Sequence, residues 1–308
     1  MDRVDFSSAF YIKLGRGGEW EDDSISTGKL RFGWSHQTLD DINAGRWALI
    51  EGQIRAVHKG KPKGQATRAL NGLRMIAKSS PEDVWITFHK AKLWWTRVSS
   101  DPVERDGVSL FRRTAQPWRD KAVDGRLLVI NDLPGPLAQI QAYRWTMCRV
   151  RCPDLLHRTL SGTRSDLAKK ISSNRDALTQ HLSMAIKELH WKDFEILVDL
   201  MFRAAGWVRV SILGKDAKAY DLILQEPITG DRYVVQVKSR AGLADLEATV
   251  AKFSDKDFRH VYFVVHSPTK DLADATELPD HVKVLPPDLL ARQAMDAGLA
   301  GWLEDKVS

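Results

Sequence analysis

The chain has 308 residues, 43% of them hydrophobic and 28% charged, which is an ordinary composition for a globular protein of about two domains. It lacks the roughly 18-residue apolar run of a transmembrane helix, its first residues lead into no apolar segment, and its 2 cysteines are too few for a disulfide scaffold. These features argue against a membrane or secreted protein and predict a cytoplasmic one, while the formal net charge of +6 suggests a polyanionic partner.

Charge and tryptophan are divided unevenly along the chain. Residues 1–160 contain 26 Lys and Arg against 18 Asp and Glu, whereas residues 161–308 contain 20 against 22. Eight of the 11 tryptophans come before residue 150. Two halves of different composition predict two domains with different tasks. We expect a basic, Trp-rich domain at 1–150, a helical connector at 151–188 and a second domain at 189–308.

Short runs of aromatic and β-branched residues dominate the first half and are typical of strands. The exception is residues 64–78, where apolar residues recur on one side of a helix. Residues 85–89 and 93–98 flank a three-residue link, which predicts a hairpin. The pattern predicts a small, twisted, barrel-like sheet with one or two helices. The expected strands are 9–14, 29–34, 85–89, 93–98, 126–130 and 143–148.

Helix and strand alternate in the second half. Phe194, Leu197, Val198 and Met201 repeat at helical spacing, and Gly206 ends that helix. The element order is αβββαβ followed by βα, so the whole chain combines α+β and α/β organisation in two domains. The expected strands are 207–212, 219–225, 232–238, 260–265 and 281–285, with further helices at 243–257 and from 287 onward.

The two strands on either side of the turn at 226–231 bring three polar residues together. Counting back from that turn, Asp221 lies opposite Gln236. Because side chains alternate along a strand, Lys238 shares a face with Gln236. The positions that then face the core are Leu222, Leu224, Val235 and Val237.

These polar residues have the chemistry of a metal-assisted hydrolytic site. Asp221, Gln236 and the backbone carbonyl of Val237 supply hard oxygen ligands of the kind that Mg²⁺ takes. Lys238 would orient or deprotonate an attacking water and offset charge on a phosphorane. Glu195, on the preceding helix, can approach the same end of the sheet and ligate the metal through water. The structural alternative is an Asp–Lys ion pair at a sheet edge.

Four short motifs follow one another in this half of the chain. They are Phe194-Glu-Ile-Leu-Val198, Gly206-Trp207, Asp221 and Val235-Gln-Val-Lys238, and a tail of Val261-Tyr-Phe-Val-Val265 and His281-Val-Lys-Val-Leu285 comes after them. In order and spacing they resemble the Mrr-like branch of the PD-(D/E)XK nucleases, over roughly the last 120 residues.

The resemblance implies a restriction-endonuclease-like αβββαβ core and a Mg²⁺-dependent endodeoxyribonuclease in which Mn²⁺ can substitute. It implies catalytic roles for Asp221, Gln236, Lys238 and Glu195, and a metal held at Asp221, Gln236 and Val237. Glutamine is normal at this position of the branch, although it brings one negative charge fewer to the metal than Glu or Asp. Many relatives have glycine–aspartate–glycine–glycine before the catalytic strand, in the loop that faces DNA. This chain instead has Gly214-Lys-Asp-Ala-Lys-Ala-Tyr220.

A basic run in the first half predicts contacts with phosphates. Between Arg46 and Lys78 the one acidic residue is Glu51, and from His58 to Lys78 there is none. Phosphate contacts position a protein on DNA without reading its sequence, although a solvated charged face explains the run equally well. The candidate DNA-binding residues are Arg46, Arg55, Lys59, Lys61, Lys63, Arg68 and Arg74.

The aromatic residues of the first half suggest a base pocket. A flipped base stacks between aromatic walls, and Tyr11, Trp34, Trp94 and Trp95 are candidates for such walls. For each of them the hydrophobic core is the competing explanation. The short strands with a basic helix loosely resemble PUA-like modules, a superfamily that includes readers of modified bases.

A PUA-like reader fused to an Mrr-like nuclease resembles a modification-dependent, type IV-like restriction enzyme that cleaves foreign double-stranded DNA, for example DNA with modified cytosine, in antiviral defence. One active site cuts one strand, so double-strand cleavage predicts a homodimer or two successive encounters. Two alternatives stay open. One is a DNA-binding defence or regulatory protein with an inert nuclease fold, and the other is a repair nuclease that reads DNA structure. No membrane partner is expected.

Overall fold

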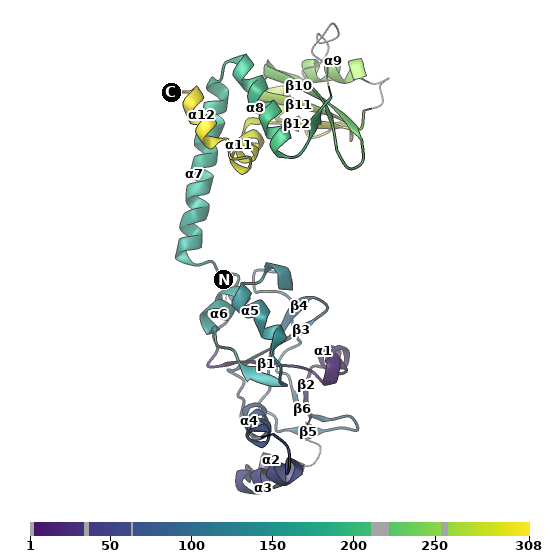
Figure 1. Cartoon of the computed structure of the whole chain (residues 1–308), viewed down its shortest axis with the longest axis vertical. Helices are drawn as coiled ribbons and strands as arrows, with labels where there is room; N and C mark the ends of the chain where they lie inside the picture. The colour runs from purple at the N-terminus through teal and green to yellow at the C-terminus, as the bar shows by residue number, and fades with distance from the viewer. Residues whose placement is uncertain (1–2, 34–36, 63, 211–221, 254–257) are drawn as a thin grey trace. The chain divides into compact units, whose positions relative to one another are not determined.

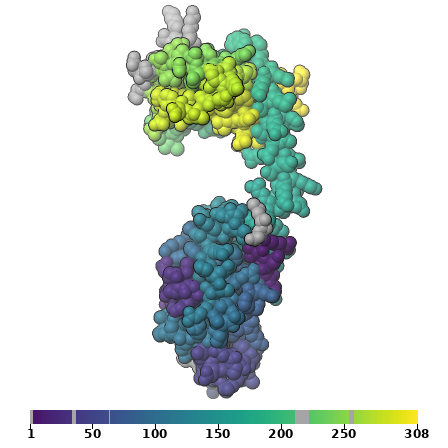
Figure 2. All heavy atoms as spheres, turned by 180° about the vertical axis from the view of Figure 1, so that it is seen from behind, coloured from purple at the N-terminus to yellow at the C-terminus, as the bar shows by residue number. Residues whose placement is uncertain are grey.

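The computed structural model describes residues 3–33, 37–62, 64–210, 222–253 and 258–308. The chain forms two compact units, Met1–Ser165 (unit 1) and Asp166–Ser308 (unit 2), which Figure 1 shows as ribbons and Figure 2 as atoms from the opposite side. Within the described ranges, no helix has both the length and the hydropathy to span a membrane.

The described part of unit 1 contains two sheets. The first has the strand order β4-β3-β1-β7, in which β1 pairs with β3 in parallel and with β7 antiparallel. The second, β2-β6-β5, is antiparallel. The helices and strands are β1 (Ala9–Ile12), α1 (Glu21–Thr27), β2 (Lys29–Phe32), α2 (Leu39–Asn43), α3 (Trp47–Val57), α4 (Gln65–Ala77), β3 (Val84–His89), β4 (Lys92–Arg97), β5 (Glu104–Arg105), β6 (Leu110–Arg113), α5 (Gly135–Ala138), β7 (Met147–Arg149) and α6 (Pro153–Ser161), with short 3₁₀ turns at Arg16–Gly18, Ile130–Asp132 and Gln139–Ala142.

The hairpin predicted near residue 90 is confirmed. β3 pairs antiparallel with β4, from Val84 opposite Arg97 to His89 opposite Lys92. The two linking residues, Lys90 and Ala91, have φ angles of 47° and 57°. Left-handed backbone at both central positions is what a two-residue hairpin turn needs to match the twist of its strands.

Unit 1 has its core on both sides of the first sheet. On one side, Ile50 of α3 and Leu73 of α4 pack with Trp85, and all three are fully buried. On the other side, Ile86 packs with Leu156 of α6. The apolar face expected for the helix at 64–78 is therefore the face that α4 buries.

The barrel-like sheet expected for the first half is wrong, because no sheet of the described residues is closed into a barrel. Two segments expected as strands fail to complete it. Residues 126–130 form only isolated bridges, and residues 143–146 are not a strand. Between these segments, around Pro134 and Pro136, the chain forms short helices. Proline has no backbone N–H and therefore cannot donate a hydrogen bond to a neighbouring strand.

Unit 2 has a five-stranded mixed sheet with the order β12-β11-β10-β9-β8. β10, β11 and β12 run parallel, while β9 pairs antiparallel with both β8 and β10. The order αβββαβ followed by βα, predicted from the sequence, is found from α8 to α11, except that the short helix α10 between β11 and β12 was not predicted. The helices and strands are α7 (Asp166–Glu188), α8 (Trp191–Ala204), β8 (Val208–Arg209), β9 (Leu222–Gln225), β10 (Arg232–Ala241), α9 (Leu243–Phe253), β11 (His260–Pro268), α10 (Lys270–Ala273), β12 (Val282–Leu285), α11 (Pro287–Asp296) and α12 (Ala300–Lys306).

Helices cover both faces of this sheet (Figure 1). α7, α8, α11 and α12 bury their apolar sides against one face, where Phe194 and Val235 belong to the same core. α9 lies against the other face, where Phe253 packs with Val234. Because β10 is covered on both faces, its side chains are buried from Tyr233 to Val237.

Candidate active site

β10 carries the polar residues that the sequence analysis selected. Gln236 is 8% exposed, pairs in register with Phe263 of β11, and lies on the face that α9 covers. Strand alternation places Lys238 and Arg240 on the same face, and both are exposed. The row therefore runs from a buried amide to two surface cations along one strand. Sequence reasoning missed Arg240, which the same period of two would have found.

The register of the β9–β10 hairpin is the one predicted. Gln225 pairs with Arg232, and Leu222 pairs with Val235. The four positions predicted to face the core all belong to the cluster beneath α8: Leu222, Leu224, Val235 and Val237. Asp221, predicted to lie opposite Gln236, is outside the described residues.

Glu195 lies in a different layer of unit 2. It is half-buried on α8, beside the fully buried Phe194. α8 packs on the face that carries Val235 and Val237, whereas Gln236 and Lys238 lie on the face of α9. The structure thus places Gln236 and Lys238 on one face of the sheet, whereas Glu195 lies in the helical layer on the opposite face.

His266 is a second polar residue of this sheet, on β11. It is 6% exposed, its ring lies edge-on to Phe194 with centroids 4.7 Å apart, and its Nδ1 is 2.9 Å from the hydroxyl of Ser267. Burial, with a smaller effect of the nearby Lys187 ammonium, lowers the pKa of His266. The imidazole is therefore held neutral within a largely apolar layer.

The donors on β10 fit a hard divalent cation. Gln236 offers an amide oxygen and Val237 a backbone carbonyl, and both are ligands that Mg²⁺ takes alongside water. Among the residues the structure describes, no three His, Cys, Asp or Glu side chains gather as a metal site. The carboxylate expected to complete the set, Asp221, lies outside those residues.

The basic run of unit 1 is only partly available for phosphates. Arg46 lies 2.9 Å from Asp41, Arg55 lies 2.7 Å from Glu51, and Arg74 lies 3.7 Å from the same Glu51. The remaining residues of the predicted set differ in position: Lys59 and Lys61 are exposed in the turn after α3, Arg68 is exposed on α4, and Lys63 is outside the described residues.

The aromatic residues proposed as pocket walls belong to the core. Tyr11 is 3% exposed and Trp95 is 2% exposed, and both pack in the core beneath α6. Trp94 is half-buried in the other core, and its indole N–H donates to the carbonyl of His89 at 3.2 Å. Tyr11 and Trp95 therefore have no open face for a base, Trp94 is partly covered, and Trp34 lies outside the described residues.

Comparison with known proteins defines the class of unit 2. Residues 186–285, which include α8, β10 and β11, match the family Mrr_cat, described as a restriction endonuclease. This part of the chain is a restriction endonuclease catalytic domain of the Mrr type, as its motifs indicated. Such a domain implies a DNA nuclease.

A solved structure is similar over a longer stretch. It is the MspJI restriction endonuclease in complex with a 27-mer oligonucleotide, at 14% sequence identity and a TM-score of 0.30, covering 80% of this chain and 69% of that one. No curated protein matches the chain.

Proposed function

We propose that this protein is a metal-dependent DNA endonuclease of the modification-dependent restriction type. The observation that carries the proposal is the row Gln236–Lys238–Arg240 on β10, inside a segment that matches the restriction endonuclease family. A buried amide followed by exposed cations suits a site in which a phosphodiester is held at the end of a sheet.

Each residue has a role in this proposal. Asp221, the amide oxygen of Gln236 and the carbonyl of Val237 would hold Mg²⁺, for which Mn²⁺ can substitute. When bound, the metal polarises a phosphoryl oxygen and makes bound water more acidic. Lys238 would orient the attacking water and offset negative charge that develops on the phosphate, with Glu195 acting through water from α8.

Unit 1 would bring the DNA to this site. The basic residues of the predicted set would contact phosphates and so hold double-stranded DNA without reading its sequence. Arg46, Arg55 and Arg74 already have carboxylate partners, and Arg68 lies over the indole of Trp145, so we assign the stronger contribution to Lys59 and Lys61. Selection for a modified base, such as a modified cytosine, would also lie in unit 1.

A cleavage assay tests the proposal. Matched plasmids, either unmodified or carrying methylated, hydroxymethylated or glucosylated cytosine, are incubated with the protein and Mg²⁺ or Mn²⁺. Lys238→Ala should reduce cleavage by at least about 100-fold, the usual effect of losing an acid–base group, and leave DNA binding within about twofold. Lys283→Ala, which removes an exposed lysine from β12 on the other face of the sheet, is the matched control.

The outcomes separate the alternatives. Cleavage of a modified plasmid alone, lost in Lys238→Ala and on adding a chelator, supports the whole proposal. Cleavage of every plasmid supports the nuclease activity and contradicts selection for a modified base. DNA binding without cleavage favours an inert nuclease fold, and preferential cutting of branched DNA favours a repair nuclease. Equal loss of binding and cleavage in Lys238→Ala contradicts the assigned role of that residue.

A further inference from the structure

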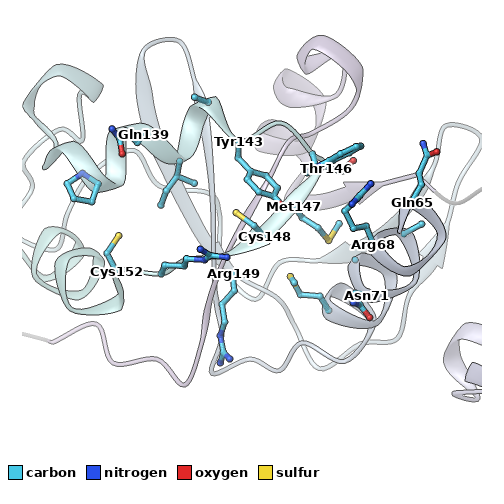
Figure 3. Close-up of a pocket in the computed structure, with 18 of the residues that line it drawn as sticks. Gln65, Arg68, Asn71, Gln139, Tyr143, Thr146, Met147, Cys148, Arg149 and Cys152 are labelled. Atoms are coloured by element: carbon cyan, nitrogen blue, oxygen red, sulfur yellow. The ribbon is translucent and has the colours of Figure 1, made fainter. Parts of the chain in front are cut away.

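Unit 1 contains a groove, lined in part by Arg68, to which the proposed function assigns no ligand. It has a volume of about 1120 Å³ and lies between one side of α4 and the segment 136–143, with β7 along its floor. Figure 3 shows Arg68 and Asn71 of α4 on one side, Gln139 across from them, and Tyr143 between. A groove of this size has room for a ligand of several rings.

The groove carries positive charge without a negative counterpart. Its lining includes Arg68, Arg149 and Arg151, and no Asp or Glu. Arg149 donates to the hydroxyl of Ser8. Among the described residues, no carboxylate forms an ion pair with Arg68 or Arg151 within 4.0 Å. Arg46, Arg55 and Arg74 of the basic run have acidic partners, so Arg68 is the described arginine of that run left for an anionic ligand, and it lines the groove.

Aromatic rings stand beside these cations. The guanidinium of Arg68 lies over the indole of Trp145, 4.2 Å from the ring centroid, and Arg144 lies 5.6 Å from the same ring. Trp145 is 39% exposed, unusually open for a large apolar side chain. Tyr143, half-buried, lines the groove next to it. An indole fixed by a stacked guanidinium is a preformed platform for another flat ring.

The other polar side chains of the groove are mainly amides and thiols, together with His58 and Thr146. Gln65, Asn71 and Gln139 each present one acceptor and one amide donor, the pairings found on the edges of bases. Burial raises the pKa of the Cys148 thiol, which therefore adds no negative charge to the floor. The groove thus offers cations that can bind a phosphate, aromatic rings on which a base can stack, and amides that can form hydrogen bonds with it.

We infer that this groove holds an unpaired nucleotide of the DNA, with its base against Tyr143 and Trp145 and its phosphate at Arg68 and Arg151. A base inside a duplex exposes only its edges, so rings that stack with a base require it to leave the helix. A surface for the duplex backbone needs cations but no rings. This assignment rests on the proposed function, because it takes DNA as the partner.

Oligonucleotide binding without metal tests the inference separately from cleavage. The full chain is titrated in a chelating buffer against three labelled probes: a single strand, a duplex with one extrahelical nucleotide, and the fully paired duplex. Trp145→Ala and Arg68→Gln should each weaken binding to the first two probes by about tenfold or more, and to the paired duplex by less than about twofold. Arg119→Gln is the matched control, since this exposed arginine lies 5.6 Å from the ring of Trp95, outside the groove.

The results show whether the groove binds an unpaired nucleotide. Unchanged binding in Trp145→Ala, or equal losses on all three probes, overturns the inference, as does the absence of binding to any probe. Photo-crosslinking of wild-type protein to an extrahelical 5-iodouracil gives a second readout that needs no variant, and the adduct should lie on Tyr143 or Trp145. If the groove binds the probes but the chain does not cleave with Mg²⁺, the nuclease proposal fails while the inference stands.

Discussion

His266 is a buried imidazole on β11 whose ring lies against Phe194. Its Nε2 has no hydrogen-bond partner among the described residues, and Phe194 covers one edge of the ring. The lowered pKa means that the folded chain takes up a proton at this position less readily than the unfolded chain. Above pH 6.5, which is about the pKa of histidine in the unfolded chain, His266 is neutral in both the folded and the unfolded state, and it does not make stability depend on pH.

Stability should therefore decline as the pH falls below about 6.5, because the unfolded chain then gains a proton that the folded chain excludes. We expect His266→Leu to reduce the drop in the melting temperature of unit 2 between pH 7.5 and pH 5.5. The carboxylates with lowered pKa, such as Asp106 and Asp271, titrate at more acidic pH and do not enter this window. An identical decline in both proteins would exclude His266 as the cause.

At the scale of elements, α4 supplies one wall of the groove and is held at its C-terminal end by Arg112 of β6. This arginine is 4% exposed. Its Nη1 donates to the carbonyls of Ile76, Ala77 and Ser79 at 3.1 to 3.3 Å, and its Nη2 donates to Ser99 at 2.7 Å. One buried cation thus satisfies carbonyls that the end of a helix leaves without partners.

Replacing Arg112 should destabilise the C-terminal end of α4. Arg112→Met removes this donor from four buried or partly buried carbonyls and should lower the stability of unit 1 by about 3 kcal/mol. Urea unfolding followed by tryptophan fluorescence measures the change. Arg113→Met, one residue further along, removes only an exposed bidentate pair with Glu104 and should leave the midpoint nearly unchanged. Equal shifts in the two variants would contradict the role of Arg112.

The sequence predicts the elements of unit 2 better than those of unit 1, for a physical reason. In β9 and β10 the alternation of apolar residues and the short turn select one register, since a slip by one residue would turn Val235 out of the core. In unit 1, the acidic segment at 21–27 suggests a loop and is instead α1, and α3 is hidden within the basic run. Tertiary packing overrides weak local preference in such segments.

The base-binding residues show a limit of sequence reasoning. Tyr11, Trp95 and Trp145 are equally plausible stacking residues when only composition is known. Which face of a strand turns inward depends on the partner strand and on what covers the sheet. β1 and β4 turn Tyr11 and Trp95 into a core that α6 covers, whereas Trp145 precedes the short edge strand β7 and stays open.

At the scale of the whole molecule, the net positive charge and the proposed catalytic residues lie in different units. The excess of Lys and Arg lies in the first 160 residues, whereas residues 161–308 hold 20 Lys and Arg against 22 Asp and Glu. A catalytic domain without net positive charge gains little from long-range attraction to DNA. Linking it to a basic unit raises its effective concentration at the substrate.

Each chain has one β10 and therefore one proposed site, which can cut one strand at a time. A homodimer, one of the two arrangements expected from the sequence, predicts a particular response to inactive subunits. When wild-type protein is co-purified with Lys238→Ala at constant total concentration, linear plasmid should fall roughly as the square of the wild-type fraction, because both subunits must be active. Nicked plasmid should accumulate in parallel. The same titration with Lys283→Ala should leave the linear product unchanged, and a simple proportional loss with Lys238→Ala would show two successive encounters by single chains instead.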